Sequence, residues 1–102
     1  MKQKGISLLS FAQKAGKVVT GHFACEQALK RNKAYLLLLA VDAAPTTKKS
    51  FISLADQKGI PYYIWMKKEQ FGMILGKPPR AVVAVIDQHF AKILRQSLQN
   101  TC

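Results

Sequence analysis

Acidic residues are scarce in this sequence: five Asp and Glu stand against sixteen Lys and Arg, which gives its 102 residues a net charge of +11. Only two cysteines are present, Cys25 and Cys102, too few for a disulfide framework, so we expect a reduced, cytoplasmic setting. The longest apolar run, 35–41, falls far short of the roughly 20 residues that cross a bilayer. Ser7 and Gln13 interrupt the apolar residues near the start, so no signal peptide is expected. These shortages argue against a secreted, disulfide-rich protein and against a membrane protein.

The excess of positive charge coexists with a high apolar content, since 49% of the residues are hydrophobic. A disordered basic tail would lack this apolar half, and 102 residues suffice for a modest core. We therefore expect one folded domain over residues 1–102 whose surface attracts a polyanion, such as the phosphate backbone of a nucleic acid. The alternative is that the charge serves only solubility.

The pattern of apolar residues predicts helices that alternate with strands. Continuous apolar runs at 35–41 and 81–86 are typical of buried strands, and residues 60–65, with Pro61 near the start, are expected to form another strand. Helical spacing occurs at 7–15, 21–33, 45–58 and 67–75, and in a last segment with Phe90, Ile93, Leu94 and Leu98 on one stripe. Residues 17–20 are expected to form a short extended link, and residues 76–80, with two consecutive prolines, a loop. This alternation predicts an α/β domain whose sheet is covered on both sides.

The predicted second helix carries the residues most suggestive of a binding surface. One face of this helix collects Cys25, Ala28 and Leu29, and should point to the core. The opposite face collects Phe23, Ala24, Gln27, Lys30 and Arg31. Gly21 and His22 lead into the positive end of the helix, where free backbone N–H groups can receive a phosphate or a base edge. Phe23 either points outward and stacks on an unpaired base or folds under the adjacent loop.

Other candidate sites are weaker. His22 and Cys25 have the spacing of metal ligands, but a four-coordinate zinc site would need His89 and Cys102 to converge on them. Cys25 also fits the core as a small hydrophobe. No pair of acidic residues has the spacing of a catalytic couple, and no glycine-rich loop matches a nucleotide-binding pattern. We therefore expect no metal, no cofactor, no small-molecule substrate and no catalytic residue.

Two further segments keep simple structural interpretations. Trp65 and the pair Tyr62–Tyr63 are expected to pack at the margin of the sheet rather than to stack on bases. The segment Lys77–Arg80 is either a rigid turn and nothing more or a stiff basic finger beside the second helix, and both interpretations stay open.

A series of segments runs through the whole chain in a recognisable order: Leu8–Gly21, Ala28–Arg31, Leu36–Asp42, Gly59–Ile64, Phe71–Gly76 and Val82–Asp87. This series resembles the bacterial YlxQ group of the ribosomal L-seven-Ae and L-thirty-e family. The resemblance covers nearly the whole chain without large gaps. It implies a three-layer α/β/α sandwich with a small mixed sheet of about four strands, and a non-enzymatic protein that binds kink-turn RNA.

The same resemblance points to a family motif that this sequence keeps only in part. In kink-turn binders, a Gly-x-Asn-Glu segment with a Lys three residues on opens the second helix and reads tandem G·A pairs. The matching positions are Gly21 to Ala24 and Gln27, so Phe23 and Ala24 replace the Asn and Glu and cannot hydrogen-bond a guanine edge. The family's apolar loop before the last strand corresponds to Lys77–Arg80, which is charged here. The resemblance thus implies RNA binding without kink-turn specificity.

The expected RNA-binding surface combines the start of the second helix with the loop before the last strand. Phe23 would stack on a base, Gly21 would allow a close approach of the RNA backbone, and cations would contact phosphates. The full set is Lys17, Gly21, His22, Phe23, Ala24, Gln27, Arg31, Lys77 and Arg80. The partner would be structured RNA in a ribosome or another ribonucleoprotein. The alternative is a protein-interaction module that kept the fold and lost RNA, which predicts an exposed apolar patch around Phe23 and weak salt dependence of binding.

Overall fold

The computed structural model describes residues 3–99, in which helices and strands alternate along the chain. The helices are α1 (Gln3–Lys14), α2 (His22–Lys30), α3 (Pro45–Lys58), α4 (Lys68–Leu75) and α5 (Gln88–Gln99). The strands are β1 (Val18–Thr20), β2 (Leu36–Leu39), β3 (Tyr62–Ile64) and β4 (Val82–Val85). Within residues 3–99, no helix combines the length and the apolar character that crossing a bilayer requires.

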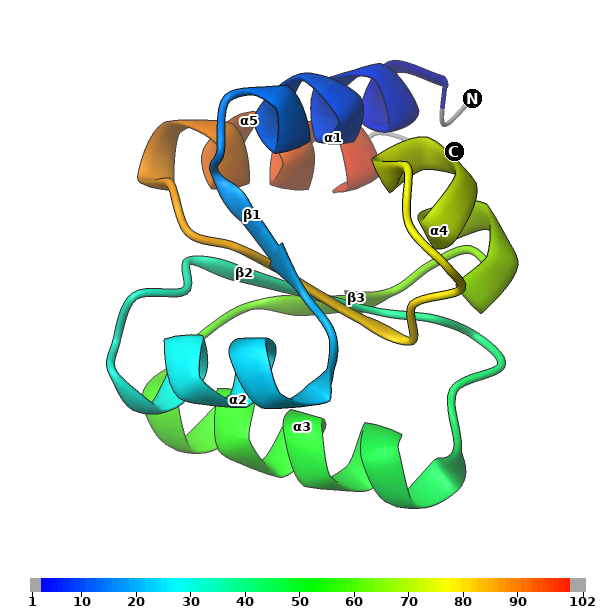
Figure 1. Cartoon of the computed structure of the whole chain (residues 1–102). Coiled ribbons are helices and arrows are strands. Elements are labelled where there is room, and N and C mark those ends of the chain that lie inside the picture. Colours follow the sequence, from blue (N-terminus) through cyan, green and yellow to red (C-terminus); the bar gives the residue numbers. More distant parts are fainter. Residues whose placement is uncertain (1–2, 100–102) are drawn as a thin grey trace.

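The strands of the described region form one mixed sheet in the order β1-β4-β2-β3. β4 runs antiparallel to both of its neighbours, β1 and β2, whereas β2 and β3 are parallel. Figure 1 shows α1, α4 and α5 over one face of the sheet and α2 and α3 over the other. The fold is therefore a three-layer α/β/α sandwich, which confirms the predicted class.

The sheet separates two hydrophobic cores. Every residue of β2 and β4 is buried, and successive side chains along each strand point to opposite faces. One core, under α1, α4 and α5, receives Leu36, Leu38, Val83 and Val85. The other core, under α2 and α3, receives Leu37, Leu39, Val82 and Ala84. A strand covered on both faces needs an apolar residue at every position, which is why these two strands are visible in the sequence as continuous apolar runs.

Two helices have different ends from those predicted. α1 begins at Gln3 instead of residue 7, because Gly5 lets the helix pack closely on Trp65: a Cβ at Gly5 would lie 3.3 Å from the indole ring. α2 ends at Lys30 instead of about residue 33, because Asn32 adopts a positive φ of 58° that ends helical geometry. Packing in the first case and a local backbone conformation in the second override the apolar spacing.

The predicted link at residues 17–20 is a strand, β1. Its three residues pair with β4 in register, with Val18 opposite Val85 and Thr20 opposite Val83. The segment is too short to be recognised as a strand by periodicity. Its pairing with a strand more than sixty positions later fixes its conformation and, as described below, brings the start of α2 to the loop before β4.

The aromatic residues after α3 pack at the margin of the sheet, as predicted. Gly59 ends α3 in the left-handed conformation, with a φ of 68°, and β3 follows as an edge strand. Trp65 is buried and meets Phe71 edge-to-face, with 6.0 Å between the ring centroids. Tyr62 and Tyr63 are partly buried, one against each core.

Candidate nucleic-acid interface

The second helix starts after a glycine with a backbone conformation that other residues rarely adopt. Gly21 has a φ of 93°, and its N–H donates to the carbonyl oxygen of Val82 at 3.0 Å. A Cβ there would meet no atom within 4 Å, but the positive φ would strain any other residue. No side chain caps the start of α2, so the N–H groups of its first turn are free to bind a ligand.

The outward face of α2 is accessible, as the helical spacing predicted. Cys25, Ala28 and Leu29 are buried, whereas 73% of Phe23 is exposed. The interpretation in which Phe23 folds under the adjacent loop is therefore wrong. Gln27 lies one helical turn further along the same face. The start of α2 thus offers an aromatic ring beside free backbone donors, the pair of groups that contacts bases and phosphates.

The loop before β4 is held against α4. Lys77 donates its N–H to the carbonyl oxygen of Gly72 at 2.8 Å, and Arg80 donates to that of Lys68 at 3.1 Å. A Cβ on Gly72 would come within 2.7 Å of the carbonyl oxygens of Lys77 and Pro78, so this approach requires glycine. Lys77 is exposed, whereas Arg80 is partly buried and its Nε has no hydrogen-bond partner within the described residues.

The start of α2 and this loop lie at the same end of the sheet. Val82, two residues after Arg80, begins β4 and accepts the hydrogen bond from Gly21. Figure 1 shows the loop running from α4 to the start of β4, beside the end of β1 from which α2 begins. We call this region the α2–loop surface; it comprises Gly21, His22, Phe23, Ala24, Gln27, Lys77 and Arg80. This surface contains most of the residues that were predicted from the sequence to bind RNA.

Two of the predicted cations lie away from the α2–loop surface. Arg31 is the C-cap residue of α2, about 12 Å along the helix axis from Phe23. The carbonyl oxygen of Lys17 accepts a hydrogen bond from the N–H of Ile86. Ile86 follows the last residue of β4, whereas Val82 is the first residue of that strand. The side chains of Lys17 and Arg31 are both exposed. Lys17 and Arg31 can therefore contact only an RNA that extends along α2 and β1.

His22 and Cys25, considered above as metal ligands, have different surroundings. The His22 ring packs edge-on against Phe51 of α3, with 5.0 Å between the ring centroids. Cys25 is buried, its Sγ lies 3.5 Å from the Val19 carbonyl oxygen, and burial raises the pKa of its thiol to about 12. Cys102 lies outside the described residues. Among residues 3–99, no group of three or more His, Cys, Asp or Glu side chains could hold a metal ion.

Cys25 should resist alkylation in the folded protein. A Cys102→Ser variant leaves Cys25 as the single thiol. With its pKa raised from 9.0 to about 12, this thiol ionises roughly a thousandfold less than an exposed one near pH 8. We expect iodoacetamide to modify Cys25 only after denaturation, as measured by mass spectrometry. Rapid modification of the native protein would instead show that α2 opens readily.

The profile of the Ribosomal protein L7Ae/L30e/S12e/Gadd45 family matches residues 3–95 of this chain. The chain belongs to this family. It is similar to the RNA-binding protein YlxQ of Bacillus subtilis, with 36% identity over 85% of this chain and 87% of that one, which places it among the YlxQ-type members. The large ribosomal subunit protein eL8 of Thermoplasma volcanium is 27% identical over 85% of this chain and 73% of its own length. A solved structure of a protein with unknown function from Bacillus halodurans C has a TM-score of 0.92 at 28% identity, covering 95% of this chain and 98% of that chain.

The structure shows where this chain departs from the motif of the L7Ae/L30e family. Phe23 and Ala24 stand in the uncapped first turn of α2, where the resemblance implies Asn and Glu, and the Lys position is the partly exposed Gln27. Sequence reasoning missed the part that Gly72 plays in seating the loop. The available signal was an isolated glycine within a predicted helix, which costs about 1 kcal/mol of helix stability relative to alanine and therefore indicates a packing requirement.

Proposed function

We propose that this protein binds RNA through the α2–loop surface, as a non-enzymatic component of a ribosome or another ribonucleoprotein in the cytoplasm. The observation that carries the proposal is that an uncapped helix start, an exposed phenyl ring and a cationic loop lie together at one end of the sheet. The net charge of +11 supplies the long-range attraction for phosphates. The YlxQ relative is called an RNA-binding protein and eL8 a ribosomal protein, and both names support the proposal.

Each part of the α2–loop surface would supply a different contact. The N–H groups of Phe23 and Ala24 donate to a phosphate or a base edge, and the Phe23 ring stacks on an unpaired base. Gly21 leaves open space for the RNA backbone, since no atom lies where a Cβ would point. Lys77 and Arg80 contact phosphates from the loop. For Arg80, an RNA oxygen would provide the acceptor that its Nε lacks among residues 3–99.

The remaining predicted residues would act at the borders of this surface. His22, with its ring against Phe51, and Gln27, one turn beyond Phe23, offer polar side chains to the sugar-phosphate backbone. Lys17 and Arg31 would neutralise phosphates of RNA that continues past the α2–loop surface. In contrast, Lys30 already pairs with Glu26 at 3.4 Å, so its charge contributes less.

The exposure of Phe23 also suits a second function, that of a protein-interaction module that kept this fold and lost RNA binding. The two functions differ in their salt dependence. If about 4–6 phosphates are neutralised, the plot of log affinity against log salt concentration should have a slope on the order of −3 to −5. Filter binding of a structured RNA at several salt concentrations measures this slope. A flat slope, or no binding at low salt, would favour the protein-interaction module.

Affinity for a standard kink-turn should be no better than affinity for a kink-turn whose G·A pairs have been mutated. The physical reason is that Phe23 and Ala24 offer no side-chain hydrogen bonds to guanine edges. A gel-shift series with the two RNAs at one salt concentration measures the ratio. About a hundredfold preference for the intact motif would contradict this prediction, since such a ratio requires direct recognition of the G·A pairs.

A further inference from the structure

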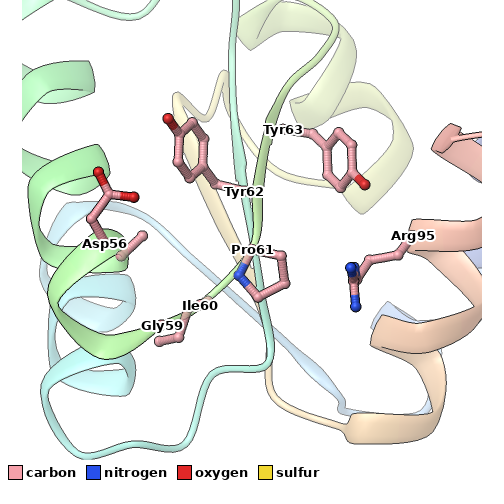
Figure 2. Close-up of a pocket in the computed structure, with 8 residues that line it drawn as sticks. Asp56, Gly59, Ile60, Pro61, Tyr62, Tyr63 and Arg95 are labelled. Carbon is pink, nitrogen blue, oxygen red and sulfur yellow. The ribbon is translucent and has the colours of Figure 1, made fainter.

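A second concave surface lies where the sheet ends at its edge strand β3. A solvent-open hollow of about 510 Å³ spans this edge between α3 and α5. Figure 2 shows Pro61 in the middle, with Asp56 and Tyr62 on the α3 side and Tyr63 and Arg95 on the α5 side. Successive residues of a strand point to opposite faces, so Tyr62 lines the hollow on one side of the sheet edge and Tyr63 lines it on the other.

Two smaller hollows adjoin this one and share residues with it. Tyr35 and Pro61 line both of them, Arg95 lines one, and Asn32 the other. We call the combined region the Pro61 hollow. Its aromatic and cationic side chains are Tyr35, Lys58, Tyr62, Tyr63, Lys92 and Arg95.

The composition of the Pro61 hollow favours a nucleic acid. Tyr35 is 43% exposed, and both Lys58 and Lys92 are exposed. Asp56 is the acidic residue of the lining, so positive charge predominates. Aromatic rings for bases, surrounded by cations for the backbone, are the groups that bind single-stranded nucleic acid. The volume of the hollow between α3 and α5, about 510 Å³, lies within the roughly 300–1,000 Å³ that is typical of sites for small ligands, the scale of a single nucleotide.

Arg95 provides an independent indication of a ligand. Within residues 3–99, the buried side-chain nitrogen and oxygen atoms without a hydrogen-bond partner are Nε of Arg95 and Nε of Arg80. A buried donor without an acceptor is unfavourable, and the side chain gains a hydrogen bond by turning toward an anionic oxygen. One such arginine therefore lies at each of the two surfaces.

The two surfaces lie at opposite ends of β4 and are connected by exposed positive charge. Gly21 is hydrogen-bonded to Val82, the first residue of β4, and the N–H of Tyr35 donates to the carbonyl oxygen of Val85, the last, at 2.9 Å. This separation is roughly 10 Å along the strand. Arg31, exposed at the end of α2, directly precedes Asn32 of the Pro61 hollow. An RNA strand leaving Phe23 along α2 thus passes Arg31 before it reaches this hollow.

We propose that the Pro61 hollow binds an unpaired segment of the RNA whose structured part occupies the α2–loop surface. Tyr35 stacks on a base, Lys92 and Arg95 contact the phosphates beside it, and Asp56 accepts a hydrogen bond from a base or a ribose hydroxyl. The inference rests on the proposed function, because it assigns a second contact to the same class of ligand.

The test uses an unstructured single-stranded RNA of about ten nucleotides and fluorescence anisotropy. Tyr35→Ala and Lys92→Glu change exposed side chains and leave both cores intact. Lys92→Glu should weaken binding roughly tenfold relative to Lys4→Glu, which makes the same charge change on the exposed surface of α1, and Tyr35→Ala should weaken it roughly tenfold relative to the unmodified protein. If Tyr35→Ala and Lys92→Glu bind the RNA with the same affinity as Lys4→Glu, the proposal is overturned. A peptide would then remain as the alternative occupant of the hollow.

Two further measurements locate the contact and separate the two proposals. An oligonucleotide that carries 4-thiouridine should crosslink to Tyr35 or Tyr63 on irradiation, and crosslinks confined to Phe23 and the loop would overturn the inference.

The second measurement is the affinity of the Lys77→Glu variant for a structured hairpin RNA. If Lys77→Glu binds the hairpin as tightly as the unmodified protein, the proposed function of the α2–loop surface fails, while the oligonucleotide still decides the role of the Pro61 hollow.

Discussion

Phe23→Ala should weaken the binding of structured RNA by roughly 1–3 kcal/mol, about 5- to 150-fold, while the stability of the fold stays nearly constant. The reason is that 73% of this ring is exposed, so truncation removes a stacking platform without leaving a cavity. A buried phenylalanine would instead cost about 3–5 kcal/mol of stability when truncated. Binding isotherms and thermal melts of the same preparation measure both quantities. Normal RNA affinity in a folded Phe23→Ala protein would remove Phe23 from the interface.

Substitutions of the same residue separate stacking from simple apolar contact. Phe23→Trp keeps a flat aromatic face and should retain the affinity for RNA, whereas Phe23→Leu keeps apolar bulk without a ring and should lose it. If the protein is instead a protein-interaction module, Phe23→Leu should keep its affinity for the partner protein. Arg31→Ala serves as a charge control on the same helix: it should weaken binding of all RNAs alike and reduce the salt slope by about one.

Gly72→Ala should destabilise the protein and also weaken RNA binding, although an alanine normally stabilises a helix. The helical preference of alanine over glycine amounts to about 1 kcal/mol. Against it stands a Cβ within 2.7 Å of two backbone oxygens in the loop, and overpacking of this kind costs about 1–3 kcal/mol. The two consecutive prolines stiffen the loop, so we expect it to move as a unit and displace Lys77 and Arg80. Denaturant unfolding and RNA titration of the variant measure the two effects.

Met73→Ala is the matched control for Gly72→Ala. Met73 follows Gly72 on α4 and is 78% exposed, so its truncation changes neither the core nor the seat of the loop. Its stability and RNA affinity should stay close to those of the unmodified protein. A Gly72→Ala protein that is more stable and binds RNA normally would show that the loop yields easily or takes no part in binding.

The sequence was sufficient to predict those elements whose environment is uniform along their length. β2 and β4 are covered on both faces, so every position is apolar, and the runs at 35–41 and 81–86 could be recognised directly. The ends of α3 were predictable because Pro45 fits the first helical turn and Gly59 adopts the left-handed conformation. The faces of α2 followed from helical spacing alone, which put Cys25 inside and Phe23 outside.

Elements that depend on distant contacts were harder to predict. β1 has no distinctive pattern and is a strand because β4 pairs with it. The first turn of α1 depends on the fit of Gly5 against Trp65, which no local preference indicates. The same limit applies to the candidate site, where Arg31 shares a helical face with Phe23 but lies at the other end of the helix. The Pro61 hollow was not predicted, because its residues come from three separate stretches of chain.

The interior position of β4 has a consequence for protein synthesis. β1 pairs with β4 alone among the strands of the described residues, yet β4 leaves the ribosome more than sixty residues after β1. Until residues 82–85 emerge, Gly21 lacks the carbonyl oxygen that positions it, and the loop at 76–80 has no strand to follow. A nascent or prematurely terminated chain that stops before β4 would therefore carry the positive charge of this protein without an assembled α2–loop surface. Under the proposed function, such fragments should bind RNA more weakly than the finished protein and should not compete with it for RNA.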